Sequence, residues 1–380
     1  MSSDSITVTL DGRVVDELPA ERIVLDYPGL TARAEVCMGR TGDGDVWAAI
    51  GFNTGLRGAH GHVNPERVFR SSDGGTTWDR RPLGPTGSRR MCGFTVLADD
   101  TFLLTVGTDH DHEERDELQV FASTDRGETW DGPSVIGAAP FERIAGSFES
   151  ITQTDSGTVL LPAVRQSGEG LDGPKAHVAF SSVDGGRTWG EPYATFDDVY
   201  EPHVLQLESG KLLGAFRYQR DWRPDDPPEM VETMGAGPST SVPGIPGSGS
   251  TAFKHVFVGD SFDDGRTWQD LRPLRTKQGK PVISFGECHG QLAQVPDGRV
   301  IMVHDRRYPY DRAEVRARVS EDDGLTWLPE TFHVSAGHGY PASVTLDDGT
   351  IATVTGATPY DAQANVLGDW RAEAVRWRLP

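Results

Sequence analysis

Cysteine, lysine and long apolar runs are all scarce in this 380-residue chain. The three cysteines, Cys37, Cys92 and Cys288, are odd in number and lack metal-ligand spacing, so we expect neither a disulfide framework nor a cysteine-based metal centre. No apolar segment approaches the length that spans a bilayer. The N-terminus has no basic region followed by an apolar core, so no signal peptide is expected and we predict a cytoplasmic protein.

Positive charge is also in deficit. The chain has 36 lysines and arginines against 57 aspartates and glutamates, which gives a formal net charge of −21 and a pI near 4.9. Such a surface repels phosphate backbones and anionic lipid headgroups, so we predict neither a nucleic-acid partner nor a membrane partner. The composition gives no indication of an oligomeric state.

The chain does contain a short phrase, Ser-x-Asp-x-Gly-x-Thr-Trp, that recurs five times. The copies occupy residues 71–78, 123–130, 182–189, 261–268 and 320–327. Each residue type suits a turn: the Asp accepts bonds from nearby backbone N–H groups, the Gly permits a positive φ, and the Trp packs between sheets. Recurrence at such intervals predicts a supersecondary unit stacked several times. Calcium binding by the five aspartates is the alternative to a structural turn, and we favour the turn.

A second signal counts the units. Six short turns separate apolar strands, at residues 43–44, 99–100, 156–157, 209–210, 297–298 and 348–349. Most of them have the residue types of β-hairpin turns. Five phrases with six hairpins predict six similar units, of which the last lacks the phrase.

The phrase is the Asp-box, and through it the chain resembles the sialidase-like six-bladed β-propellers. The resemblance implies an all-β fold of four-stranded antiparallel blades in a single domain over residues 1–380, with each box between two outer strands. We expect strands at 23–26 and 373–379 to share the last blade and close the ring. A Pro-, Gly- and Ser-rich insertion at 220–250 is either a mobile loop over the central face or a disordered surface segment.

The ligand face of a propeller is built where the innermost strands begin. At equivalent positions before the six inner turns lie Glu35, Met91, Phe148 (followed by Glu149), Glu201, His289 and Tyr340. A pure scaffold would favour small or β-branched residues at such strand starts. The ring of Glu, His and Tyr therefore indicates a functional site.

The resemblance gives some of these residues roles. In sialidases a tyrosine at the start of the last blade is the nucleophile, a glutamate from the fourth blade activates it, and three arginines hold the substrate carboxylate. This implies Tyr340 as nucleophile, Glu201 as its base and Arg217 as the second arginine, with Arg33 as candidate for the first. The third is open among Arg306, Arg307, Arg312 and Arg316, and the other substrate-binding candidates are Glu35, Glu149, His203 and His289.

The chemistry behind these roles is physically sound. A phenol is a weak nucleophile at its usual pKa near 10, and a neighbouring carboxylate can take its proton during attack. Arginine binds a carboxylate through two parallel hydrogen bonds and so orients the sugar. The structural alternative is that Tyr340 is a packed turn residue and Glu201 merely pairs with an arginine.

The chain departs from the sialidase pattern at the acid/base. Sialidases carry a catalytic aspartate in the first-blade loop, but residues 53–66 contain no Asp and offer His60 and His62 instead. The second-blade loop, 108–116, offers Asp109 and Asp111. Either loop could supply the proton donor. Histidines beside acidic residues on a charged loop are more often solvated than metal-bound, so we expect no metal and no cofactor.

These observations predict a sialidase-like glycoside hydrolase acting on an acidic sugar, either a small molecule or an oligosaccharide. Two alternatives stay open. One is a uronate lyase, in which Tyr340 with His203 or His289 would abstract a proton beside the carboxylate. The other is a non-catalytic carbohydrate-binding propeller, because a fold does not fix a function. The missing aspartate favours these two alternatives.

Overall fold

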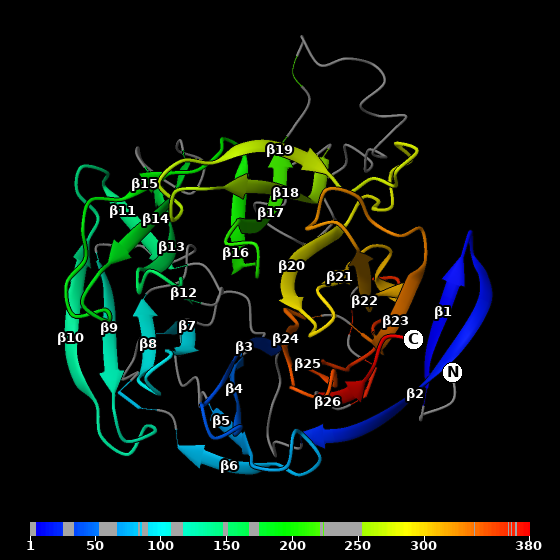
Figure 1. Ribbon diagram of the computed structural model, residues 1–380, viewed down its shortest axis with the longest axis horizontal. Coiled ribbons are helices and arrows are strands. Elements are labelled where there is room, and N and C mark those ends of the chain that lie inside the picture. Colours follow the sequence, from blue (N-terminus) through cyan, green and yellow to red (C-terminus); the bar gives the residue numbers. More distant parts are fainter. Residues whose placement is uncertain are drawn as a thin grey trace.

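Antiparallel sheets are arranged in a ring around a central axis in the computed structural model (Figure 1). The structure describes residues 5–25, 34–52, 67–82, 84–85, 90–107, 117–146, 151–166, 175–220, 223, 253–337, 339–363, 365, 367–368 and 371–380. Within these ranges the only helical element is a short 3-10 turn, η1 (Tyr310–Arg312). Across the same ranges no helix has the length and apolar character needed to span a bilayer. The insertion expected at 220–250 lies outside the described residues apart from Arg220 and Arg223.

The strands form antiparallel units that run from the centre outward. The first unit contains β3 (Ala34–Arg40), β4 (Val46–Phe52), β5 (Arg67–Ser71) and β6 (Asp79–Pro82). The second contains β7 (Arg90–Val96), β8 (Phe102–Gly107), β9 (Glu117–Ser123) and β10 (Asp131–Gly137). The innermost strand of the third is divided into β11 (Arg143–Gly146) and β12 (Thr152–Gln153), and is followed by β13 (Val159–Gln166), β14 (Lys175–Ser182) and β15 (Tyr193–Ala194).

The remaining units repeat this plan. The fourth contains β16 (Val199–Gln206), β17 (Leu212–Arg220), β18 (Phe253–Ser261) and β19 (Gln269–Pro273). The fifth contains β20 (Glu287–Gln294), β21 (Val300–Arg306), β22 (Glu314–Ser320) and β23 (Thr331–Ala336). The last contains β24 (Ala342–Thr345), β25 (Ile351–Gly356), β26 (Ala372–Trp377) and, as its outer strand, β2 (Arg13–Leu25). The predicted all-β propeller of four-stranded antiparallel blades is confirmed.

An N-terminal hairpin closes the ring. Strand β2 pairs with the C-terminal strand β26, from Ala20 opposite Trp377 to Leu25 opposite Ala372. Strand β1 (Ser5–Leu10) pairs with β2 on one side and with β23 of the fifth unit on the other. The predicted sharing of the last blade by strands from both ends of the chain is confirmed (Figure 1). Because β1 joins the fifth and last units into one nine-stranded sheet, the described residues contain five sheets but six four-stranded units.

The core consists of apolar side chains packed between neighbouring units. One cluster joins the fifth unit to the last and includes Val303, Val315 and Trp377. A second joins the fourth unit to the fifth through Val256, Leu292 and Met302. This arrangement follows from the alternating pattern of each strand, which presents apolar residues to both neighbours. The interfaces fix the angle between units and therefore the positions of the innermost strands.

The Asp-boxes form the turns between the third and fourth strands of the first five units. In the box at 261–268, the Ser261 hydroxyl donates to Asp263 and accepts from the Gly265 N–H. The Thr267 N–H and hydroxyl donate to the two carboxylate oxygens of Asp263, at 2.8 and 2.6 Å. Trp268 Nε1 donates to the Gly265 carbonyl at 3.1 Å. Both carboxylate oxygens are thus used within the turn, which favours the structural role over calcium binding.

Replacing Ser261 with alanine tests this role. Ser261 is fully buried, and its loss leaves the Gly265 N–H without its partner and removes one of the two donors to Asp263 Oδ1. We expect the free energy of unfolding to fall by about 1–3 kcal/mol, the cost of an unsatisfied buried polar group. Urea denaturation measures it. The exposed neighbour Phe262, replaced by alanine, should change stability by less than about 0.5 kcal/mol. Equal losses in the two variants would contradict the assignment.

Candidate active site

The innermost strands enclose a central cavity. Its volume is about 730 Å³, and polar side chains such as Thr95, Gln206 and Gln294 line it. His203 also lines the cavity, and its Nδ1 accepts from the Leu292 N–H at 3.1 Å. Glu201 and Tyr340 are absent from the lining, although they lie at the beginnings of strands that contribute to it. The candidate site therefore lies outside the cavity, at the beginnings of the innermost strands whose later residues line it.

Two of the predicted site residues have unusual backbone conformations. Glu201 and His289 have φ angles of 41° and 52°, in the left-handed region that non-glycine residues avoid. Each lies in a β-bulge near the start of its innermost strand, one in β16 and the other in β20. A bulge redirects a side chain, and strain of about 1–3 kcal/mol of this kind clusters at functional sites. The same distortion at equivalent places in adjacent units aims both side chains at Tyr340.

Tyr340 links the last unit to the first. It forms an isolated parallel bridge with Glu35, and its carbonyl accepts from the Val36 N–H at 3.1 Å. This bridge fixes the backbone of Tyr340 just before β24. The Tyr340 hydroxyl donates to Glu201 Oε1 at 2.9 Å. A phenol and a carboxylate from different units are thereby held in direct contact.

Glu201 is surrounded by donors. Its Oε2 is paired with Arg217 Nη1 at 2.5 Å and with His289 Nε2 at 2.8 Å. Burial by itself would raise the pKa of the Glu201 carboxyl, but the charges of Arg217 and His289 hold that pKa well below its usual value. Glu201 is therefore ionised, and it can accept the proton of Tyr340.

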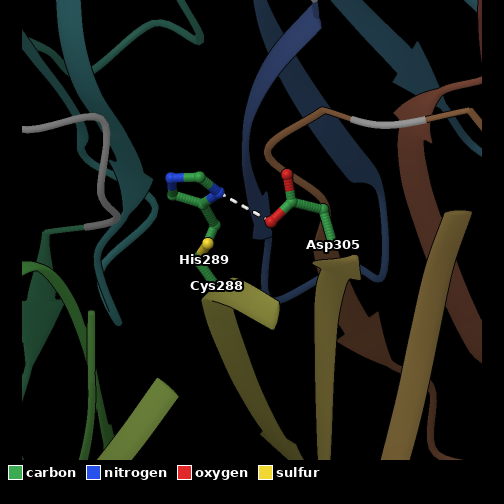
Figure 2. Close-up of side chains that lie close together, drawn as sticks. All are labelled: Cys288, His289 and Asp305. Atoms are coloured by element: carbon green, nitrogen blue, oxygen red, sulfur yellow. Dashed lines mark hydrogen bonds and ion pairs between the residues drawn. The ribbon is translucent and has the colours of Figure 1, made fainter. Parts of the chain in front are cut away.

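His289 extends the contacts to the next strand. Figure 2 shows its ring directed at the carboxylate of Asp305, and the distance from Nδ1 to Asp305 Oδ1 is 2.7 Å. Arg307 Nη2 lies 3.4 Å from the other oxygen of Asp305. Charges thus alternate from Arg217 through Glu201, His289 and Asp305 to Arg307. The Tyr340 ring lies against this series, with its centroid 3.8 Å from that of His289.

Positive charge is in excess around Tyr340. Lys254 is only 8 % exposed, and its Nζ has no hydrogen-bond or ion-pair partner among the described residues. Burial, with the nearby charges of Arg217 and Arg307, lowers the pKa of Lys254 to about 7. Arg307 is also buried, and its Nε has no partner in the same part of the chain. A buried ammonium and a buried guanidinium N–H without acceptors are costly, so Lys254 Nζ and Arg307 Nε indicate a site for an anionic ligand.

The structure places the other predicted residues elsewhere. Arg306 pairs with Glu314 at 3.4 Å, and Arg316 pairs with Glu287 and Glu314, so these two arginines belong to a separate network of ion pairs. Of the four candidates for the third arginine, Arg307 is the one that contacts the site, with its guanidinium carbon 5.9 Å from the centre of the Tyr340 ring. The candidates outside the described residues are Arg33, His60, His62, Asp109, Asp111 and Glu149.

Sequence reasoning missed Asp305 and Lys254. A signal for Asp305 existed, because Glu201 and Arg217 are 16 residues apart, and so are His289 and Asp305. The two pairs occupy equivalent places on the first two strands of adjacent units. Lys254 is the second residue of β18, the third strand of its unit, and no pattern at the innermost strand starts could have indicated it.

A metal ion is the remaining possibility at this place. The ligand atoms of Cys288, His289 and Asp305 lie within 4.8 Å of one another. However, His289 Nδ1 is already hydrogen-bonded to Asp305, and burial raises the pKa of the Cys288 thiol, which opposes the thiolate that a metal requires. The neighbouring Arg307 also repels a cation. These residues fit a hydrogen-bonded pair better than a metal centre.

The comparisons with known proteins agree with the fold. Residues 86–225 match the family model of the BNR repeat-like domain. A Dyadobacter fermentans protein of unknown function has a TM-score of 0.65 at 16 % identity, over 98 % of this chain and 100 % of that one. No curated protein matches the chain.

Glycosidases are among the similar solved structures. Trypanosoma rangeli sialidase, as a covalent intermediate with 2,3-difluorosialic acid, has a TM-score of 0.59 at 14 % identity, over 99 % of this chain and 56 % of that one. The GH93 α-L-arabinofuranosidase of Fusarium graminearum with arabinobiose has a TM-score of 0.60 at 14 % identity, over 94 % and 97 %. The chain therefore has a sialidase-like, BNR-repeat propeller fold.

Proposed function

We propose that the protein is a glycoside hydrolase that acts on a carboxylate-bearing sugar, with Tyr340 as nucleophile and Glu201 as its base. The observation that carries this proposal is the 2.9 Å hydrogen bond from the Tyr340 hydroxyl to an ionised Glu201. The excess of buried positive charge beside it supports an anionic sugar. The glycosidases among the structures of the same fold support the reaction class only by analogy.

In the proposed reaction, Tyr340 Oη forms a bond to the anomeric carbon while the bond from that carbon to the leaving oxygen breaks. The tyrosine proton moves to Glu201 Oε1, and the leaving oxygen takes a proton from a donor that we place in residues 53–66 or 108–116, with His60, His62, Asp109 and Asp111 as the candidates. Water then attacks the same carbon, loses a proton to that donor, and Tyr340 recovers its proton from Glu201. A neutral nucleophile suits an anionic sugar, because a carboxylate would repel the substrate.

The anionic group of the sugar would be held by Arg307 and Lys254, together with the free N–H groups of Arg217. Arg217 already donates to Glu201 and, through Nε, to Gln219 at 2.9 Å. Five N–H donors on one guanidinium leave some for a substrate. Arg307 and Lys254 have the unpartnered atoms described above, and they would acquire partners when a carboxylate binds.

A lyase is the second candidate, because the His289 ring lies against Tyr340. Both nitrogens of that ring are already directed at carboxylates, so His289 is poorly placed to abstract a carbon-bound proton. Tyr340 itself would have to be the base. This difference favours hydrolysis.

The test of the reaction uses two sets of substrates. The 4-nitrophenyl glycosides of sialic acid and of hexuronic acids report hydrolysis through released nitrophenol, and uronate oligosaccharides report elimination through the ultraviolet absorbance of an unsaturated product. The trap 2,3-difluorosialic acid, with fluorinated uronosyl fluorides beside it, should add covalently to Tyr340, and peptide mass spectrometry locates the adduct. An unsaturated product would favour the lyase, and no turnover of any sugar would refute both enzymes.

The pH dependence of binding tests the role of Lys254. An anion binds the protonated amine better, and the Lys254 pKa is about 7, so affinity should weaken as pH rises through 7, by up to about tenfold per pH unit. Titration calorimetry with glucuronic acid and N-acetylneuraminic acid at several pH values measures it. Lys254→Met should bind more weakly and lose this dependence. Lys280→Met, at an exposed lysine paired with Asp11, is the control. An unchanged pH dependence in Lys254→Met would exclude this lysine.

A further inference from the structure

The His289–Asp305 pair is the least expected part of the site. Neither side chain is accessible, with His289 at 1 % and Asp305 at 0 % exposure. In the fifth unit, His289 and Asp305 occupy the places that Glu201 and Arg217 occupy in the fourth, with the signs of charge exchanged. The reaction proposed above does not use the His289–Asp305 pair. Its position between Glu201 and Arg307 nevertheless puts it in contact with the group that takes the proton of Tyr340.

The hydrogen-bond distances assign the protons of His289. Nε2 lies 2.8 Å from Glu201 Oε2, and Nδ1 lies 2.7 Å from Asp305 Oδ1. The contacts of the same nitrogens with Arg217 and Arg307 are longer, at 3.2 and 3.3 Å. A carboxylate oxygen can only accept, so each ring nitrogen donates a proton to the carboxylate that it faces. His289 is therefore an imidazolium between two anions.

We propose that His289, oriented by Asp305, is a positioning residue that directs the proton of Tyr340 to a single oxygen of Glu201. This inference rests on the proposed function. His289 and Arg217 both occupy Oε2, so only Oε1 is available when the Tyr340 O–H bond breaks and a new O–H bond forms on the carboxylate. His289 keeps both of its protons in this step. Its positive charge also lies beside the tyrosine ring and favours the negative charge that develops on Oη.

Asp305 is the part of this arrangement that can be changed without touching Glu201 or Tyr340. Its Oδ1 lies 2.7 Å from Nδ1 of His289. Asp305→Asn removes the carboxylate charge at that contact and should therefore weaken the orientation of the His289 ring towards Glu201.

The experiment compares wild type with Asp305→Asn, His289→Gln and His289→Ala, using whichever 4-nitrophenyl glycoside the wild type hydrolyses. We expect Asp305→Asn to lower kcat by about 10- to 100-fold while KM changes little. His289→Gln keeps a donor near Oε2 and should retain more activity than His289→Ala. The control is His304→Gln. His304 precedes Asp305 on β21 and is also buried, but it lies outside the charge series, with its Nδ1 3.3 Å from the backbone carbonyl of Asp305.

A second measurement does not depend on turnover. Nitrogen NMR of protein labelled at histidine, assigned with His289→Gln, reports whether both nitrogens of His289 carry protons near neutral pH. Two protonated nitrogens in the wild type would support the proposal. A neutral ring in the wild type would overturn it, and so would equal losses of kcat in Asp305→Asn and His304→Gln. If the wild type hydrolyses no glycoside, the proposed function fails, and the NMR result still decides the protonation of His289.

Discussion

Replacing Tyr340 with phenylalanine is expected to lower kcat/KM by about a thousandfold or more, because the variant keeps the packing of the ring and loses only the nucleophilic oxygen. The ring lies on His289, and phenylalanine preserves that contact. Steady-state kinetics on the glycoside hydrolysed by the wild type give the ratio. The covalent adduct with the fluorinated trap should also disappear in mass spectra.

The interpretation of Tyr340→Phe depends on an intact fold, so thermal unfolding accompanies the kinetics. Tyr310→Phe is the matched control, because Tyr310 lies on η1, outside the charge series, and its hydroxyl donates to that of Tyr308 at 3.4 Å. That variant should retain its kcat. Wild-type kcat in Tyr340→Phe would remove Tyr340 from the mechanism.

Replacing Glu201 with alanine is expected to lower the free energy of unfolding by about 3–5 kcal/mol, the usual cost of removing one partner of a buried ion pair. The substitution leaves Arg217 and His289 buried without the carboxylate that both contact. Urea denaturation near neutral pH measures the loss. Glu208→Ala, at an exposed glutamate of the same unit, should change stability by less than about 0.5 kcal/mol.

The sign of the pH effect makes this prediction more specific. The pKa of Glu201 is lower in the folded protein than in the unfolded chain, so its ionisation stabilises the fold above its unfolded value of 4.5, and that contribution is lost as pH falls below it. Stability of the wild type should therefore decrease more steeply in acid than that of Glu201→Ala. Parallel pH curves for the two proteins would show that Glu201 contributes no such linkage.

The fold could be predicted because its signals are local and repeated. Each Asp-box encodes its own turn within a few residues, as the contacts of Asp263 with Thr267 illustrate. The repetition then aligned the units with one another. This alignment placed Tyr340 and Glu201 at equivalent strand starts, and in the structure the Tyr340 hydroxyl lies 2.9 Å from Glu201 Oε1.

The partners around that pair could not be predicted, because they depend on which face of a strand each residue occupies. Arg306 and Arg307 are adjacent in the sequence, yet Arg306 pairs with Glu314 and Arg307 with Asp305. Alternation along β21 sends neighbours to opposite faces, and no sequence pattern states which face meets Tyr340. The bulges at Glu201 and His289 shift that alternation further.

The closing hairpin imposes an order on biosynthesis. Strand β2 leaves the ribosome long before its partner β26. Strand β1 likewise leaves it long before its partner β23. The two strands can pair early with each other, but their outer edges stay open until β23 and β26 have been made, and open strand edges invite pairing with other chains. The pairings of β1 with β23 and of β2 with β26 complete the ring, and a nascent chain is most exposed to misassembly before they form.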